Sequence, residues 1–155
     1  MSANSQESSR EIEIREARRR KHASNLRGYP QARMNDGRYL KTDIDGLITH
    51  GRTPGPKPSE EGIKAAVDWL LTRVKRGRVP NVSSLRCRRA AERWHGGGIE
   101  ISNGAMIVAT EICGFSQSAG RDEWSRCTKI GIWVSDFKKL PEARETATAD
   151  SEVVS

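Results

Sequence analysis

The sequence contains no apolar run of the ~18 residues that a membrane-spanning helix needs. Residues 1–20 also lack an apolar stretch after their charged side chains, which argues against a secretory signal peptide. Cysteine is scarce, since only Cys87, Cys113 and Cys127 occur. An odd number of thiols without paired spacing is typical of reduced cysteines, so we expect a cytoplasmic protein.

Motifs for catalysis and metal binding are also missing. The three cysteines and His95 lack the paired spacing of a structural zinc site. The HGGG stretch at residues 95–98 resembles an oxyanion-hole motif, but no G-x-S-x-G nucleophile elbow accompanies it. The GRTPGPK stretch at residues 51–57 lacks the G-K-S/T ending of a phosphate-binding loop. The sequence therefore predicts no enzyme, no metal site and no cofactor.

Basic side chains outnumber acidic ones. The chain has 27 Lys and Arg against 20 Asp and Glu, and its net charge is +7. Residues 1–58 carry 12 basic and 7 acidic side chains, residues 59–140 carry 14 and 9, and residues 141–155 carry 1 and 4. A basic body with an acidic tail is typical of a protein that binds a polyanion, although the same excess of charge also serves solubility alone.

The distribution of aromatic residues predicts where the core lies. All tryptophans and phenylalanines fall within residues 59–140, so we expect one compact helical core there. Residues 1–58 are predicted to be a basic, largely flexible arm that ends in a linker rich in proline and glycine. Within this arm, residues 36–51 are compatible with a short strand or an extended segment. Residues 141–155 are predicted to be a disordered acidic tail.

Two helices are predicted at the start of the core. The first begins after Ser59 as N-cap, ends before Gly77, and leaves Trp69 off its apolar stripe. That stripe consists of Ile63, Ala66, Val67, Leu70, Leu71 and Val74. The second helix begins at Ser83 or Ser84 and ends before the HGGG stretch. Its apolar stripe consists of Cys87, Ala90, Ala91 and Trp94.

Residues 99–115 allow two incompatible structures. Asn103-Gly104 between apolar residues is a signal for a tight β-hairpin. Ser102, in contrast, is a good helix N-cap, and Gly114 stands where a C-cap glycine would. We favour the helix, because a strand over residues 105–109 would have to be buried on both faces. In a helix, Gly104 is an ordinary first-turn residue, so Gly104→Ala is expected to be neutral or slightly stabilising.

A β-hairpin is predicted after this helix, with strands near residues 112–117 and 128–135 and a polar turn between them. The resulting fold class is mostly α with a small β-hairpin. The element order of three helices and a hairpin predicts a winged-helix-like core with disordered ends.

Residues 83–115, followed by KIGIWVS, resemble a group of small uncharacterised proteins of bacterial phages and plasmids. The matching residues are Ser83, Ser84, Glu92, Trp94, Ser102, Asn103, Gly104, Gly114 and Phe115. The resemblance implies an Ala-rich helix over residues 103–113, where this chain has Ile, Val and Thr in place of several alanines. It implies a mobile-element origin and brings no established biochemical activity.

A row of arginines is the main candidate for function. Arg86, Arg89 and Arg93 recur on one face of the second helix, and Arg88 lies further round. Arginine side chains bind phosphates and release counterions, so this pattern favours a nucleic-acid partner, DNA rather than RNA. The other candidate contacts are Ser102, Asn103, Arg121 and Arg126, and Arg18, Arg19 and Arg20 of the arm.

Residues 103–113 carry Glu111 as their one charged side chain, so the helix at residues 83–94 is expected to make more of any DNA contact. The sequence thus predicts a small DNA-binding accessory or regulatory protein of the phage type. The alternative is a protein-interaction module or inhibitor whose basic face meets an acidic protein surface. A solvated helix face without a ligand also explains the arginines.

Overall fold

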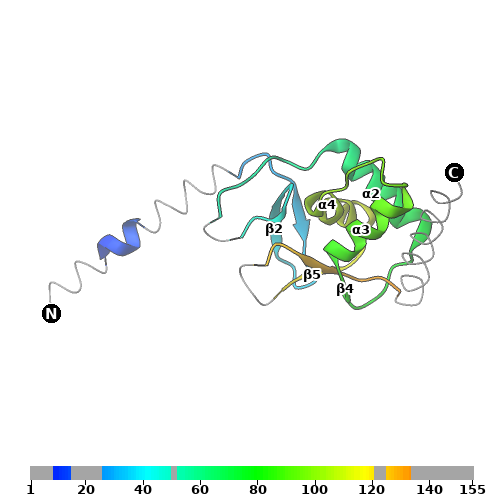
Figure 1. The fold of residues 1–155 in the computed structure, drawn as a ribbon. Coiled ribbons are helices and arrows are strands. Elements are labelled where there is room, and N and C mark those ends of the chain that lie inside the picture. The colour runs from blue at the N-terminus through cyan, green and yellow to red at the C-terminus, as the bar shows by residue number, and fades with distance from the viewer. Residues whose placement is uncertain (1–8, 15–25, 50–51, 121–124, 134–155) are drawn as a thin grey trace, which may run out of the picture.

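The computed structural model describes residues 9–14, 26–49, 52–120 and 125–133, and Figure 1 shows their arrangement. Residues 9–14 form the short helix α1. The remaining elements are β1 (Gln31–Arg33), β2 (Tyr39–Asp43), β3 (Gly46–Leu47), α2 (Glu60–Arg73), β4 (Val82–Ser83), α3 (Ser84–Trp94), α4 (Asn103–Cys113), β5 (Gln117–Ala119) and β6 (Thr128–Ile130).

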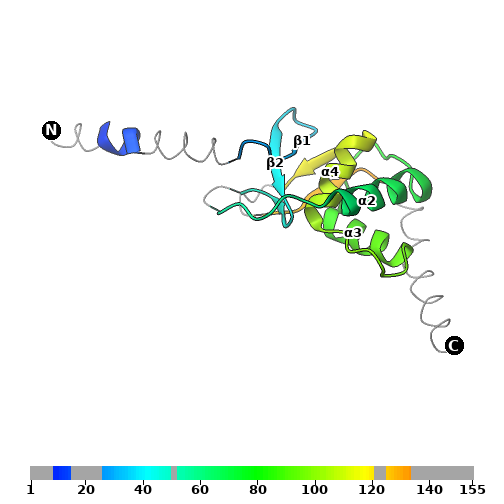
Figure 2. The same ribbon diagram turned by 90° about the horizontal axis from the view of Figure 1, so that it is seen from above.

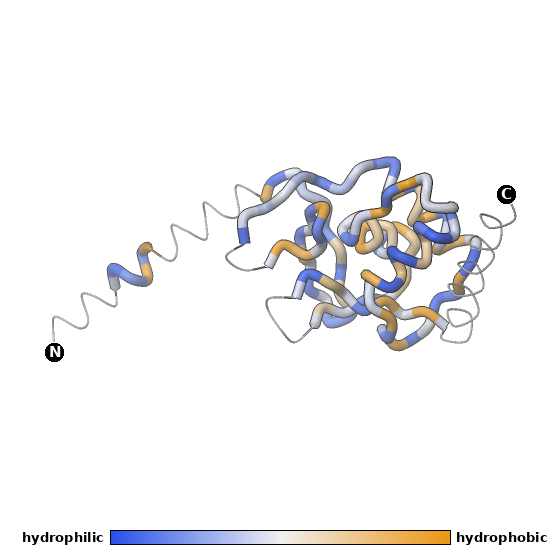
Figure 3. Tube along the Cα trace, viewed as in Figure 1, coloured by the Kyte–Doolittle hydropathy of each residue, from blue (hydrophilic) through white to orange (hydrophobic). Residues whose placement is uncertain are grey.

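Helix α4 is the centre of the fold. It contacts α2, α3 and all three strands of the N-terminal sheet, and Figure 2 shows the sheet on one side of it and the two helices on the other. Every residue from Asn103 to Thr110 is buried. Figure 3 shows that apolar positions gather on this central helix while the outer loops are hydrophilic. A helix that is apolar all round needs such cover on every side.

The helix predicted over residues 103–113 is confirmed. Ser102 is its N-cap, and its hydroxyl accepts a hydrogen bond of 3.0 Å from the Ala105 amide. Gly114 ends it in the left-handed region with φ of 75°, and the Phe115 amide then donates to the Thr110 carbonyl at 3.1 Å. Both ends therefore use the capping residues that the sequence indicates.

The N-terminal sheet was not predicted. Strands β1, β2 and β3 form an antiparallel sheet in the order β1-β2-β3. Ala32, Met34 and Leu47 of this region are buried together with Ile107 of α4. The prediction that residues 26–49 belong to a flexible arm is therefore wrong, whereas the strand considered within residues 36–51 exists. A few apolar residues are enough to hold this sheet in place, because only one of its faces packs against α4.

Strands β5 and β6 pair as the predicted C-terminal hairpin, and a third strand joins them. The predicted bounds of the first strand are wrong, because residues 112 and 113 belong to α4 and β5 begins only at Gln117. The sheet has the order β4-β6-β5, with Val82 opposite Ile130 and Gln117 opposite the same residue on the other side. Strand β4 is only two residues long, so its sequence carries no periodic signal.

The buried face of α2 differs from the predicted stripe. Trp69 is buried and Leu71 is 66% exposed, the reverse of the prediction. Ala65, Ala66 and Leu70 complete the large buried contact of this helix. The small alanines let α2 lie close to α4, and Trp69 is on the same buried side of the helix. For α3 the predicted stripe is confirmed, because Cys87, Ala90 and Ala91 are buried and Trp94 packs against the core.

The winged-helix prediction is wrong. The described residues form a mixed α+β fold with two three-stranded antiparallel sheets. In a winged helix-turn-helix, the recognition helix, which is the last helix before the hairpin, stays open to solvent so that it can enter a DNA groove. Here α4 occupies that place in the chain, but the N-terminal sheet and the other helices bury it. The unpredicted sheet is thus the physical reason for the failure.

Candidate nucleic-acid interface

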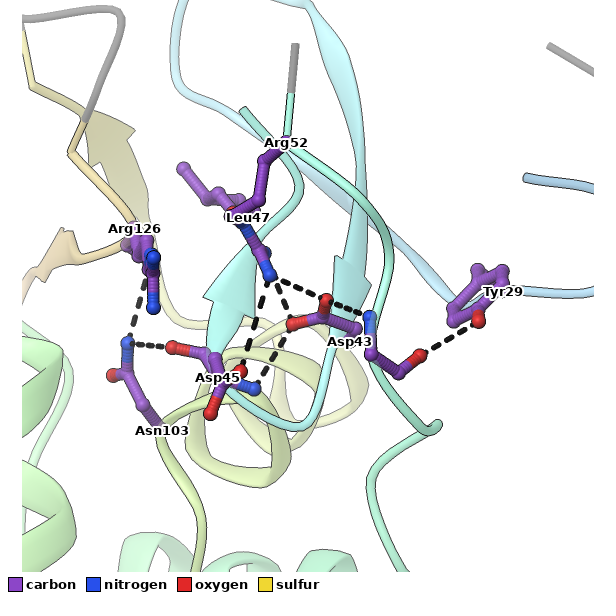
Figure 4. A network of polar contacts seen from close by, with 8 residues as sticks. Tyr29, Asp43, Asp45, Leu47, Arg52, Asn103 and Arg126 are labelled. Atoms are coloured by element: carbon purple, nitrogen blue, oxygen red, sulfur yellow. Dashed lines mark hydrogen bonds and ion pairs between the residues drawn. The ribbon is translucent and has the colours of Figure 1, made fainter. Parts of the chain in front are cut away.

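The candidate residues Ser102 and Asn103 hold the fold together at the start of α4. Asn103 is buried, and its side-chain amide donates to the Asp45 carbonyl at 3.0 Å and the Arg126 carbonyl at 3.3 Å (Figure 4). It therefore joins the turn between β2 and β3 to the segment that leads into β6. With Ser102 capping the helix, neither residue presents its polar atoms to a base edge.

Gly104 lies directly against the same turn. Its amide donates to the Ile44 carbonyl at 3.1 Å, which satisfies one of the free amides at the start of the helix. A Cβ atom at this position would overlap the Asp43 carbonyl oxygen. The Ser-Asn-Gly sequence is thus the place where the N-terminal sheet packs against α4. The structure contradicts the expectation that Gly104→Ala is neutral.

A buried ion pair fastens the segment after β3 to this sheet. Asp43 is fully buried, and its carboxylate accepts hydrogen bonds from Arg52 at 2.7 and 3.0 Å and from the Gly55 amide at 2.8 Å (Figure 4). Burial opposes the charged form, but the hydrogen bonds from Arg52, Gly55 and Asp45 outweigh it and hold the pKa of Asp43 below its ordinary value. Tyr29 adds a hydrogen bond of 2.7 Å to the Gly55 carbonyl.

The arginines of α3 divide into two groups. Arg86 and Arg89 are exposed, and Arg93 is half-buried on the same side of the helix. Arg88 instead turns toward the protein body, where its Nε donates to the Ile101 carbonyl at 2.7 Å and pairs with Glu92 at 3.2 Å. The structure therefore keeps Arg86 and Arg89 as candidates for phosphate contact and gives Arg88 a structural role.

Further basic residues precede α3 in the chain, and one lies on a neighbouring strand. Residues 73–93 contain eight Lys and Arg side chains and one acidic side chain, Glu92. Lys129 is exposed on β6 and lies opposite Ser83, the N-cap of α3. Sequence reasoning missed Lys129, although the alternation of Thr128, Lys129 and Ile130 in a predicted strand was a usable signal.

The other predicted contacts have different outcomes. Arg126 is exposed, and its carbonyl is held by Asn103 and by the Leu47 amide, so its backbone position is fixed beside the start of α4. Its side chain lines a cavity of about 370 Å³ together with Arg88, Asp45 and Glu100. The mixed charges of that lining make it a poor phosphate site. Arg121 and Arg18, Arg19 and Arg20 lie outside the described residues.

The thiols and histidine do not assemble a reactive site in the described part of the chain. Cys87 is fully buried, and burial raises the pKa of its thiol far above the ordinary value. Burial also raises the pKa of Cys113. His95 Nε2 forms a hydrogen bond of 2.9 Å with the Ala65 carbonyl. Among the described residues, no group of three or more His, Cys, Asp and Glu side chains is placed to hold a metal ion.

Comparisons with known proteins add no relative: no family model, no curated protein and no solved structure matches the chain. The resemblance to phage and plasmid proteins therefore stays a prediction. No helix in the described ranges is both long and apolar enough to cross a membrane.

Proposed function

We propose that this protein binds nucleic acid through the exposed basic face of α3 and the residues beside it. The observation that carries the proposal is the local charge: Arg86 and Arg89 point outward, Lys129 flanks the start of their helix, and Glu92 is the one acidic side chain in residues 73–93. Glu92 pairs with Arg88 at 3.2 Å. A surface of this kind attracts phosphates and releases their counterions.

The proposed contact is mainly with the phosphate backbone. Residues Asn103–Thr110 of α4 are buried, and reading a base sequence requires polar side chains that reach base edges. We therefore propose binding with little sequence preference, to duplex DNA in the first instance, by an accessory protein without catalytic activity. We also propose a cytoplasmic location, supported by three free cysteines.

The test is fluorescence anisotropy with a labelled random duplex over a series of salt concentrations. The variant Arg86→Ala/Arg89→Ala is expected to bind more weakly, and each lost phosphate contact lowers the log–log salt slope by roughly 0.9. The matched control is Arg27→Ala/Arg33→Ala, which removes the same charge from exposed positions in the N-terminal region. Its affinity for the duplex is expected to fall less.

Equal losses in the two double variants would mean that net charge, and not the face of α3, sets the affinity. Absence of duplex binding by the wild-type protein, together with binding to an acidic protein surface that depends on Arg86 and Arg89, would favour the interaction-module alternative.

A further inference from the structure

The segment between α2 and β4 forms a second basic site with a different composition. It runs beside the end of the C-terminal sheet: the Gly77 amide donates to the Gly131 carbonyl at 2.8 Å, and the Trp133 amide donates to the Lys75 carbonyl at 3.0 Å. The Asn81 side chain exchanges two hydrogen bonds with Ile132, of 3.0 and 3.2 Å. These bonds fix the backbones of the two segments relative to each other.

A cavity of about 560 Å³ opens at this junction. Its floor and walls include the indole of Trp133, which is 59% exposed, and the side chain of Val79, which is 70% exposed. Arg76 and Arg78 also line it, and both are exposed. Among the described residues that line the cavity, none is acidic. Its volume lies within the range of roughly 300–1,000 Å³ that is typical of small-molecule sites.

We propose that this cavity takes an unpaired nucleobase of single-stranded nucleic acid, which stacks on Trp133 while Arg76 and Arg78 bind the adjoining phosphates. Stacking on an exposed aromatic side chain beside cationic groups is the common chemistry of single-strand binding. A base in a duplex has both faces covered by its neighbours, so it cannot enter such a site without being unstacked. The proposal rests on the proposed function, because it deepens the same nucleic-acid binding.

The cavity and the basic face of α3 are built from consecutive parts of the chain. The loop that carries Arg76 and Arg78 continues through β4 into α3, where Arg86 and Arg89 follow. Charge complementarity favours nucleic acid over an apolar peptide, because an apolar peptide would fill the apolar part of the lining and bring no anion to Arg76 and Arg78. The site therefore predicts a preference for unpaired bases that the face of α3 alone does not explain.

The test compares a labelled oligothymidylate with a duplex of equal length by fluorescence anisotropy. Trp133→Leu is expected to weaken single-strand binding by about 5- to 150-fold, which is the cost of about 1–3 kcal/mol for one lost base stack. Duplex affinity is expected to change by less than about twofold. The matched control is Tyr39→Leu, because Tyr39 is 60% exposed on β2, outside the cavity lining, and its loss leaves both affinities unchanged.

A second measurement does not depend on the stability of Trp133→Leu. Stacking of a base on an indole quenches its fluorescence, so oligothymidylate quenches the wild-type protein, and Trp133→Phe binds the oligomer but loses this quenching. Arg76→Ala and Arg78→Ala each lower the single-strand salt slope by roughly 0.7.

Three outcomes overturn the proposal. They are a Trp133→Leu variant that binds the single strand as well as the wild type, an equal loss for single strand and duplex, and quenching that persists in Trp133→Phe. If the duplex still binds through Arg86 and Arg89 in those cases, the proposed function stands and only the cavity assignment fails. If the wild-type protein binds neither nucleic acid, both fail.

Discussion

Replacing Gly104 by alanine tests the junction between α4 and the N-terminal sheet. Its backbone φ is not positive, so alanine is conformationally acceptable there and would gain about 1 kcal/mol of helix propensity. Against this gain, the new Cβ would overlap the Asp43 carbonyl oxygen and lie 2.8 Å from its carbon and 3.1 Å from Pro58 Cγ. The turn between β2 and β3 has to withdraw, because backbone atoms cannot move aside as a flexible side chain does.

The expected loss of stability follows from two terms. Overpacking costs about 1–3 kcal/mol, and the hydrogen bond from the Gly104 amide to Ile44 contributes about 0.5–1.5 kcal/mol when it breaks. After the propensity gain is subtracted, the free energy of unfolding is expected to fall by about 2 kcal/mol. Urea denaturation of the full chain, followed by circular dichroism, measures this fall.

Gly98→Ala is the matched control. Gly98 also has no positive φ, and a Cβ there would meet nothing within 4 Å. Its replacement is expected to leave stability unchanged or to raise it slightly, by restricting the unfolded chain. If Gly104→Ala proves as stable as Gly98→Ala, the β2–β3 turn does not lie against the start of α4 and the reasoning is refuted.

Three further substitutions test the remaining contacts in the same unfolding assay. Asp43→Asn removes the carboxylate that pairs with Arg52 at 2.7 Å and leaves Arg52 only the more distant carboxylate of Asp45, at 3.9 Å. The loss is expected to be about 3–5 kcal/mol, and a smaller loss would mean that water reaches the pair. Because folding lowers the pKa of Asp43 below its ordinary value of 3.8, its contribution is complete above that pH and is lost as pH falls through the folded-state pKa, so Asp43→Asn should show a weaker acid dependence. Ser102→Ala removes the N-cap hydrogen bond and is expected to cost about 1 kcal/mol, whereas no change would argue against the cap. Trp69→Ala should cost about 3–5 kcal/mol while Leu71→Ala stays within roughly 0.5 kcal/mol, and the opposite ranking would restore the predicted stripe of α2.

Local signals in the sequence predicted where α2, α3 and α4 begin and where α4 ends, whereas α2 ends at Arg73, earlier than the predicted stop at Gly77. The caps Ser59, Ser83, Ser102 and Gly114 act within one turn of the chain, and each stands where the structure begins or ends a helix. The interaction that forms a cap involves only neighbouring residues, so the sequence alone contains the information needed.

The buried faces of the helices and the N-terminal sheet could not be predicted from local signals, because they depend on contacts between segments that are distant in the sequence. Helical periodicity shows which residues of α2 share a face, but not how much of the circumference of α2 its neighbouring helix covers. For this reason the apolar stripe does not include Trp69. Ala32 lies in a strand too short for an alternating pattern, and Met34 follows the end of that strand. The one available clue was α4 itself: a helix with apolar residues on all sides requires cover on all sides, which two other helices do not supply.

The candidate interface was predictable only in part. Helical spacing correctly grouped Arg86 and Arg89 on an exposed face. It could not show that Arg88 turns inward, because its partner is the Ile101 carbonyl beyond the end of the helix. Nor could it show that Trp133 meets Arg76 and Arg78, since their proximity arises from pairing between segments more than fifty residues apart.

The cover that the N-terminal sheet gives to α4 has a consequence for how the chain folds and how it can be divided. Ile107 is fully buried because Ala32, Met34 and Leu47 pack against it. In the sequence, these three residues precede the proline-rich segment, whereas Ile107 follows it. A fragment that starts at residue 59 would keep the helices and the C-terminal sheet but present this side of α4 to water. Such a fragment would self-associate, and during synthesis the first strands must wait for α4 to emerge before their own apolar residues find a partner.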